Sequence, residues 1–200
     1  MTIIDSVLEH LDLEQIETNL FRGISESLGM PRVFGGQVIG QALIAALRTV
    51  DDRPCHSLHG YFLRPGDPSM PIIYEVDRIR DGRSFTTRRV FAIQKGEAIL
   101  NMSASFQAYE DGLSHQVEMP EVPRPDELPS EEELFEKRKK DLTPEMIAMM
   151  KRDRPVEMKR VEDVDYMNPE KREPTQHIWY RSKKKLGDHI EQHQCLLAYA

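Results

Sequence analysis

Cysteine and tryptophan are scarce in this 200-residue sequence, which holds two of the first and one of the second. Cys55 and Cys195 stand far apart without paired metal-ligand spacing, which favours free thiols in a reducing compartment. The most apolar stretch, "VIGQALIAAL", is interrupted by Gln41 and is too short to span a bilayer. The first residues include Asp5 and no basic run, unlike a signal peptide. We therefore expect a cytoplasmic protein with no membrane partner.

A basic excess is also missing, because the formal net charge is -7. A general nucleic-acid binder usually carries the opposite balance, so no nucleic-acid partner is expected. Charged residues make up 30 % and hydrophobic residues 39 % of the chain, which is typical of a globular protein rather than a disordered one. The length allows one or two domains with a hydrophobic core.

The first 112 residues alternate between strand and helix signals. The segment 37–50 is apolar on almost every side and predicts a buried helix. A short helix is predicted at 3–12. Five strands are predicted at 14–25, 56–67, 71–82, 84–96 and 97–109. The strand connections favour antiparallel neighbours. The pattern predicts an α+β fold in which one antiparallel sheet wraps around a central helix.

The composition changes after Gly112, where prolines and charges become frequent. We expect a domain boundary there: an N-terminal domain at 1–112, a charged, proline-rich linker with helices at 113–155, and the beginning of a second domain at 156–200. The final stretch, "HIEQHQCLLAYA", predicts the opening of a helix without a stop signal. A weak echo between 14–48 and 176–200 indicates two copies of one unit, with the second cut short.

Four segments carry a family resemblance: "LFRGISESLGMPRVFGGQVIGQAL", "HSLHGYFLRPGDP", "RDGRSFTTRRVFAIQKGEAILNMSASFQ" and "HQCLLAYA". In this order and spacing they resemble type II acyl-CoA thioesterases, the TesB-like family. The resemblance implies two hotdog domains, of which this sequence holds one complete copy and the start of a second. It also implies hydrolysis of fatty acyl-CoA to free fatty acid and CoA, with no cofactor and no metal.

The same resemblance implies a catalytic Asp, a Thr or Ser, and a Gln, all of which would follow Ala200. No catalytic residue is therefore assigned within the chain, and the isolated chain is expected to be inactive. A non-catalytic acyl-CoA-binding or assembly module is the alternative, with self-association into homo-oligomers. A dehydratase-like hotdog is a third possibility, but it needs a histidine and a carboxylate in one pocket, and no such pair is evident.

Gly35, Gly36 and Gln37 open the predicted buried helix and are candidate substrate-binding residues. Backbone N–H groups at a helix start favour negative charge, so they can polarise a thioester carbonyl and stabilise an oxyanion. The glycines would let a ligand approach the backbone. The alternative is that they only form the turn before the helix.

His56 and Arg64 complete the set of candidate substrate-binding residues. The resemblance favours His56 over His59, and their separation predicts opposite faces of one strand. Arg64 suits a CoA phosphate by bidentate hydrogen bonding, although a solvated surface arginine is the plainer interpretation. The same alternatives apply to four further arginines, at positions 80, 83, 88 and 89. His189 and His193 have helical spacing for a metal, but further ligands are missing.

Overall fold

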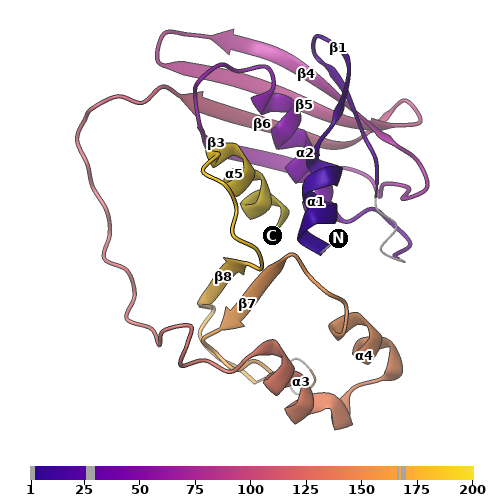
Figure 1. Cartoon of the computed structure of the whole chain (residues 1–200), viewed down its shortest axis with the longest axis vertical. Helices are drawn as coiled ribbons and strands as arrows, with labels where there is room; N and C mark the ends of the chain where they lie inside the picture. The colour runs from indigo at the N-terminus through magenta and orange to yellow at the C-terminus, as the bar shows by residue number, and fades with distance from the viewer. Residues whose placement is uncertain (1–2, 26–29, 166, 168–169) are drawn as a thin grey trace. The chain divides into compact units, whose positions relative to one another are not determined.

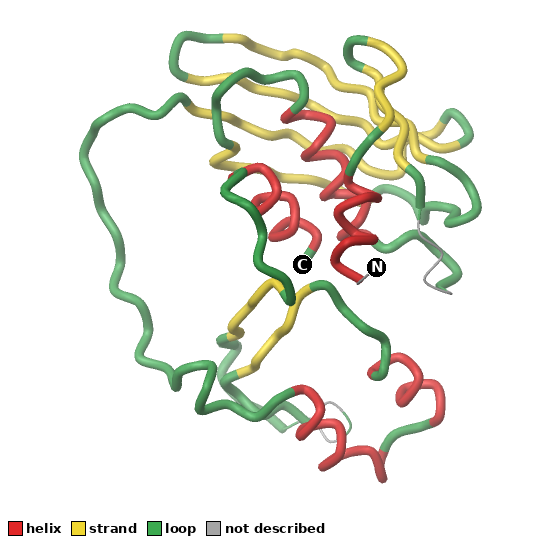
Figure 2. The backbone as a smooth tube through the Cα atoms, in the orientation of Figure 1, coloured by secondary structure: helices red, strands yellow, loops and turns green. Residues whose placement is uncertain are grey.

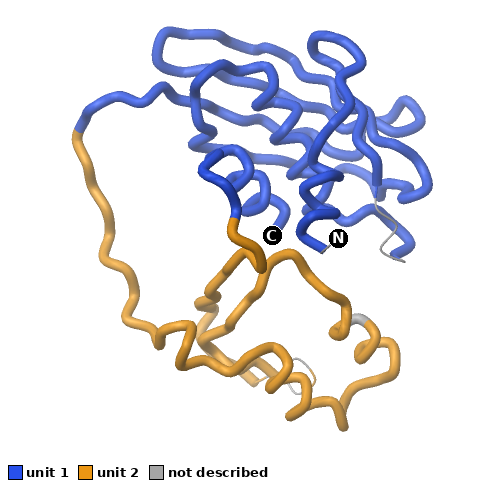
Figure 3. Tube along the Cα trace, in the orientation of Figure 1, with its two compact units in different colours: residues 1–112, 186–200 blue, residues 113–185 orange. Residues whose placement is uncertain are grey.

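A computed structural model describes residues 3–25, 30–165, 167 and 170–200 of the chain (Figure 1). Contacts divide the chain into two compact units (Figure 3). Unit 1 comprises residues 1–112 and 186–200, and unit 2 comprises residues 113–185. None of the described helices is long and apolar enough to cross a bilayer.

Unit 1 is built on a six-stranded sheet in which all neighbours are antiparallel. Figure 2 draws its strands in yellow. Its order is β1-β2-β4-β5-β6-β3, so that β1 and β3 form the two edges. The strands are β1 (Glu14–Glu17), β2 (Leu20–Gly23), β3 (Cys55–Phe62), β4 (Ile72–Asp81), β5 (Phe85–Gln94) and β6 (Glu97–Gln107). The four strands predicted after the central helix all form close to their predicted bounds.

The segment 14–25 differs from its prediction as a single strand. It forms a hairpin, with β1 and β2 joined by a turn at Thr18 and Asn19. Arg22 pairs with Glu14 across the two strands, both in register and as an ion pair. Asparagine readily adopts turn geometry and breaks the strand pattern here, a local signal that the spacing of the apolar residues concealed.

The predicted central helix is α2 (Gly35–Leu47), and it packs against one face of the sheet (Figure 1). Leu100, Met102 and Phe106 of β6 are fully buried, on the side that alternation predicts. Strand β5 differs: its buried side chains include Arg88, whereas Phe85 is 45 % exposed. The more apolar parity of β5 therefore lies on the outer face, because the register with β4 and β6 fixes which side meets α2.

Two further helices join α2 in unit 1. The predicted N-terminal helix is α1 (Ile3–Leu11), with Ile4, Val7 and Leu11 buried on one side. The predicted closing helix is α5 (Ile190–Tyr199), and it lies beside α2 (Figure 1). Gln194 of α5 holds the first residue of β3 at two points: its Oε1 accepts from the Cys55 N–H at 3.2 Å and its Nε2 donates to the Cys55 carbonyl at 2.6 Å.

Gln41 anchors a polar network inside unit 1. Its side chain is fully buried, accepts from the Tyr74 hydroxyl at 2.7 Å and donates to the His10 carbonyl at 2.5 Å. The Ile24 carbonyl accepts from Gln41 at 3.1 Å. A buried amide is tolerated only when its donors and acceptors are satisfied, so this glutamine joins α1, α2 and the sheet at a fixed position.

In the described part of unit 2, β7 (Val156–Arg160) and β8 (Ile178–Ser182) form a two-stranded antiparallel sheet. The same part holds three short helical segments, α3 (Glu131–Arg138), η1 (Lys139–Asp141) and α4 (Pro144–Met150). Ser130 and Glu133 form a capping box at the start of α3. Thr143 accepts from the Met146 N–H at 3.3 Å, as expected for an N-cap before a first-turn proline. The predicted limits at 113–155 and 156–200 stay predictions.

Candidate functional site

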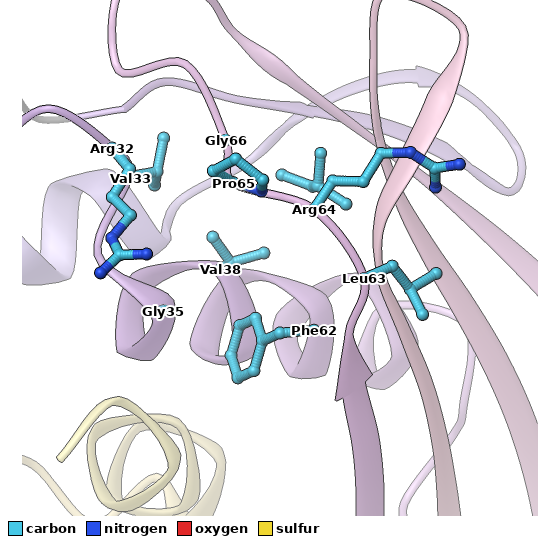
Figure 4. Close-up of a pocket in the computed structure, with 10 residues that line it drawn as sticks. Arg32, Val33, Gly35, Val38, Phe62, Leu63, Arg64, Pro65 and Gly66 are labelled. Atoms are coloured by element: carbon cyan, nitrogen blue, oxygen red, sulfur yellow. The ribbon is translucent and has the colours of Figure 1, made fainter.

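A pocket of about 340 Å³ lies in unit 1 at the start of α2 (Figure 4). It is lined by Arg32, Val33, Gly35, Val38, Phe62, Leu63, Arg64, Pro65, Gly66 and Ile99. These residues come from the loop before α2, the first turns of α2, the end of β3 with the turn after it, and β6. The lining is mainly apolar and carries two guanidinium groups, as a site for an amphipathic anion would need.

Backbone hydrogen bonds fix the walls of this pocket. The Val33 N–H donates to the Gly66 carbonyl at 2.9 Å, which joins the loop before α2 to the turn after β3. The Leu63 N–H donates to the Ile99 carbonyl at 2.9 Å and holds the same turn to β6. A Cβ at Gly66 would lie 3.1 Å from side-chain atoms of both Val33 and Ile99, so glycine permits this close approach.

The two arginines of the pocket, Arg32 and Arg64, differ in their bonding partners. Arg64 donates to the Ala98 carbonyl at 2.9 Å, and its Nε lies 3.4 Å from Glu97. Arg32 is exposed, and no ion pair joins it to another of the described residues. In Figure 4 the two guanidinium groups lie at opposite ends of the pocket. Arg32 is thus the more available cation, and sequence reasoning missed it because an isolated arginine in a loop gives no distinctive signal.

Only one of the three helix-start candidates lines the pocket. Gly35 does, and a Cβ there would lie 3.0 Å from the tip of the Phe62 ring. A Cβ at Gly36 would lie 2.0 Å from the carbonyl oxygen of Tyr199. Gln37 is buried and donates to the Ile24 carbonyl at 2.9 Å. The close approach at Gly36 is therefore made by the protein's own helix α5, and Gln37 serves the interior.

His56 does not line the pocket. A β-bulge lies between Cys55 and Ser57, and the His56 ring nitrogen Nε2 lies 2.9 Å from the hydroxyl of Ser105. Ser105 belongs to the outer face of β6, where the His56 ring also meets Phe85 edge-on at 5.7 Å. His56 is thereby separated from the α2 side of the sheet.

The prediction that His56 and His59 point to opposite faces is wrong. His59 pairs with Ser103, which alternates with the buried Met102 and Ala104 and so faces outward. The bulge adds one residue to β3 and brings both histidines to the outer face. No alternation rule applied to β3 alone reveals this extra residue.

The other candidate arginines do not converge on the pocket. Arg88 is 1 % exposed and donates to the Thr49 hydroxyl and carbonyl, both at 2.8 Å, and to the Asp81 carboxylate at 2.6 Å. These bonds tie β5 to the end of α2 and make Arg88 a structural cation. Three others, at positions 80, 83 and 89, are exposed away from the pocket lining.

No acid–base pair lines the pocket, since its ten residues include no histidine and no carboxylate. His193, one of the two histidines with helical spacing for a metal, lies outside the pocket lining, and its Nε2 is 2.7 Å from the Gly187 carbonyl oxygen. Among the described residues no group of three histidine, cysteine, aspartate or glutamate side chains is arranged to hold a metal. The arrangement can bind an apolar chain with an anionic group, but it does not activate water by itself.

Comparison with known proteins places this chain in a known family. Residues 25–107 match the family model of the acyl-CoA thioesterase N-terminal domain. The chain is 38 % identical over 198 residues to acyl-CoA thioesterase 2 of Haemophilus influenzae, covering 98 % of this chain and 69 % of that protein. This chain belongs to the acyl-CoA thioesterase II family. The hydrolase class and the α+β hotdog fold predicted from the sequence are thereby confirmed.

Solved structures support the same conclusion. The acyl-CoA thioesterase II TesB2 of Mycobacterium marinum is 40 % identical, with a TM-score of 0.71 over 97 % of this chain and 65 % of that chain. A hotdog protein of Alicyclobacillus acidocaldarius, 21 % identical with a TM-score of 0.72, shows the fold alone. The chain thus spans about two thirds of the relatives it matches.

Proposed function

We propose that this chain forms part of an enzyme that hydrolyses fatty acyl-CoA to a free fatty acid and CoA. The observation that carries the proposal is the identity of 38 % to 40 % with thioesterases over nearly the whole chain. The pocket supports it, because an acyl-CoA joins an apolar chain to a phosphate-bearing headgroup. In this assignment Gly35 and Arg64 remain substrate-binding residues and Arg32 joins them.

Each part of the pocket has a role in this proposal. Val33, Val38 and Ile99 provide apolar surface for the acyl chain. Arg32 and Arg64 are positioned to bind phosphate oxygens, which suit the planar guanidinium group. Gly36, Gln37 and His56, the remaining candidates from the sequence, act in this proposal through the packing of unit 1 and not through substrate contact.

We propose that catalysis itself requires residues that this 200-residue sequence does not contain. An aspartate would activate water against the thioester carbonyl, with a Thr or Ser and a Gln orienting that water. The lining of the pocket offers no acid–base pair, and the matched relatives are longer than this chain. The chain would then supply a wall of the substrate site and a surface for pairing.

Thiol release from long-chain acyl-CoA, together with acyl-CoA binding by calorimetry, tests this proposal. We expect saturable binding by the 200-residue chain without thiol release, and turnover when the missing third of the Haemophilus enzyme is fused to it. Turnover by the chain alone would overturn the placement of the catalytic residues. Absence of both binding and turnover, in the chain and the fusion, would overturn the thioesterase assignment.

A non-catalytic acyl-CoA-binding or assembly module is the second candidate. Tyr61 and Phe62 are 63 % and 57 % exposed on the edge strand β3, and Leu63 beside them is 49 % exposed. Exposed apolar surface at an edge strand favours self-association, so homo-oligomers remain part of the proposal. The cytoplasmic location expected from the sequence is also kept as a proposal. Light scattering that shows only monomer across the working concentration range would contradict the oligomer.

A further inference from the structure

We propose that Phe62 determines the length of the acyl chain that the pocket accepts. The inference rests on the proposed function and names a residue that no candidate set from the sequence contained. It begins from the position of the ring. Phe62 ends β3, lines the pocket, and remains 57 % exposed although it is one of the largest apolar side chains of unit 1.

The Phe62 ring contacts the first turn of α2 through its tip. From the ideal Cβ position at Gly35, the Cζ atom of Phe62 is 3.0 Å away and the Cε1 atom is 3.2 Å away. Any larger residue at position 35 would displace the ring. Glycine at this position therefore sets how far the ring extends over α2, and the ring forms one wall of the pocket (Figure 4).

The opposite wall is held more tightly. Gly66 lies against Val33 and Ile99, both of which are buried, and the Val33 N–H bonds to the Gly66 carbonyl. A packed, hydrogen-bonded wall does not move aside at low cost. Phe62, exposed on one side, is the apolar wall that can be removed without opening the core of unit 1.

Chain length is therefore expected to be limited at the Phe62 wall. Each further methylene that enters an apolar pocket strengthens binding about fourfold. Once the chain meets a wall, the gain per methylene stops. Removing the Phe62 ring is expected to extend the series of gains to longer acyl chains.

Calorimetric binding of short-, medium- and long-chain acyl-CoAs to the 200-residue chain and its variants tests the inference. With Phe62→Ala we expect the gain of about fourfold per methylene to continue past the chain length at which the wild type levels off. Tyr61→Ala is the matched control, since Tyr61 precedes Phe62 on the same strand, is exposed, and pairs with Asn101 on the outer face.

The outcomes separate this inference from the proposed function. If wild type binds acyl-CoA and Phe62→Ala levels off at the same chain length, Phe62 has no role in length selection and the thioesterase assignment stands. If Tyr61→Ala shifts the profile as much as Phe62→Ala, the effect belongs to the strand and the inference fails. If neither wild type nor any variant of the 200-residue chain binds acyl-CoA, the pocket is not the acyl site and the inference on Phe62 fails, whereas the thioesterase assignment is decided by turnover of the fusion.

Discussion

Cys195 is fully buried on α5, and burial raises the pKa of its thiol to about 12. Desolvation is the main cause, with smaller contributions from Cys55 and Glu191. Burial also raises the pKa of the Cys55 thiol. Because the thiolate is the reactive form, both cysteines are suited to packing rather than to nucleophilic or redox chemistry.

Thiol labelling at neutral pH measures the accessibility and reactivity of the two cysteines. We expect a disulfide reagent to modify Cys195 in the folded protein at least about 100-fold more slowly than in urea, because both access and thiolate are suppressed. Cys55, which is half-buried, should react before Cys195. Single variants Cys55→Ser and Cys195→Ser assign each rate. Fast labelling of Cys195 in the folded chain would contradict its burial.

The pKa of the Asp67 carboxyl is shifted in the opposite direction, to a lower value. Hydrogen bonds from the Ser69 hydroxyl and backbone N–H, with a smaller contribution from Lys95, lower the pKa of the Asp67 carboxyl to about 2. A carboxyl with a lowered pKa in the folded state adds stability above its ordinary pKa of 3.8, and this contribution is lost as pH falls toward 2.

The variant Ser69→Ala is expected to bring the Asp67 pKa back toward 3.8, because it removes the Ser69 hydroxyl, whose hydrogen bond contributes most to the lowered pKa. NMR titration of the carboxyl carbon measures the shift. Lys95→Met should have a smaller effect in the same direction. An unchanged titration in Ser69→Ala would show that the serine hydroxyl does not hold the carboxylate.

At the scale of elements, the pair of helices α2 and α5 depends on glycine at one point of contact. A Cβ at Gly36 would lie 2.0 Å from the Tyr199 carbonyl, and backbone cannot yield as a flexible side chain does. The Phe34 and Tyr199 rings meet edge-on at 5.1 Å next to this contact. Gly36 therefore sets the separation of the two helices.

Gly36→Ala is expected to lower the free energy of unfolding by about 2 kcal/mol, since overpacking forces the helices apart. Gly112→Ala is the control, because nothing lies within 4 Å of a Cβ at that position. Urea denaturation followed by circular dichroism measures both. Equal stability of the two variants would show that α5 does not lie this close to α2.

At the scale of the whole molecule, unit 1 is discontinuous in sequence. Residues 186–200 return to the fold of the first 112 residues and bury Cys195 and Leu196 there. Removing them uncovers the face of α2 that carries Gly36 and Gly40. An uncovered apolar helix face promotes self-association.

A chain ending at Lys185 is accordingly expected to be less stable by about 3 kcal/mol and to form larger species by light scattering. Within the full chain, Leu196→Ala should cost about 2 kcal/mol or more, because Leu196 is 4 % exposed. Leu197→Ala is the matched control, because Leu197 is 70 % exposed. Equal costs for the two leucines would contradict the orientation of α5.

Much of the fold follows from local pattern. The nearly all-apolar run of α2, the alternation in β6 and the turn before β5 are local features, so the sequence predicts these elements and the family resemblance names their arrangement. The hairpin at Thr18 and Asn19 was missed because a short turn inside an apolar segment leaves the spacing nearly unchanged.

The sequence by itself determined the elements, the α+β class and the family of this protein, because those depend on periodicity and on ordered motifs. The tertiary structure alone decided which candidates share a site. Gly35 and Arg64 meet Phe62 in one pocket, while a bulge carries His56 to the outer face and Tyr199 occupies the approach to Gly36. Such contacts join residues distant along the chain, and the register and packing that create them have no local signal.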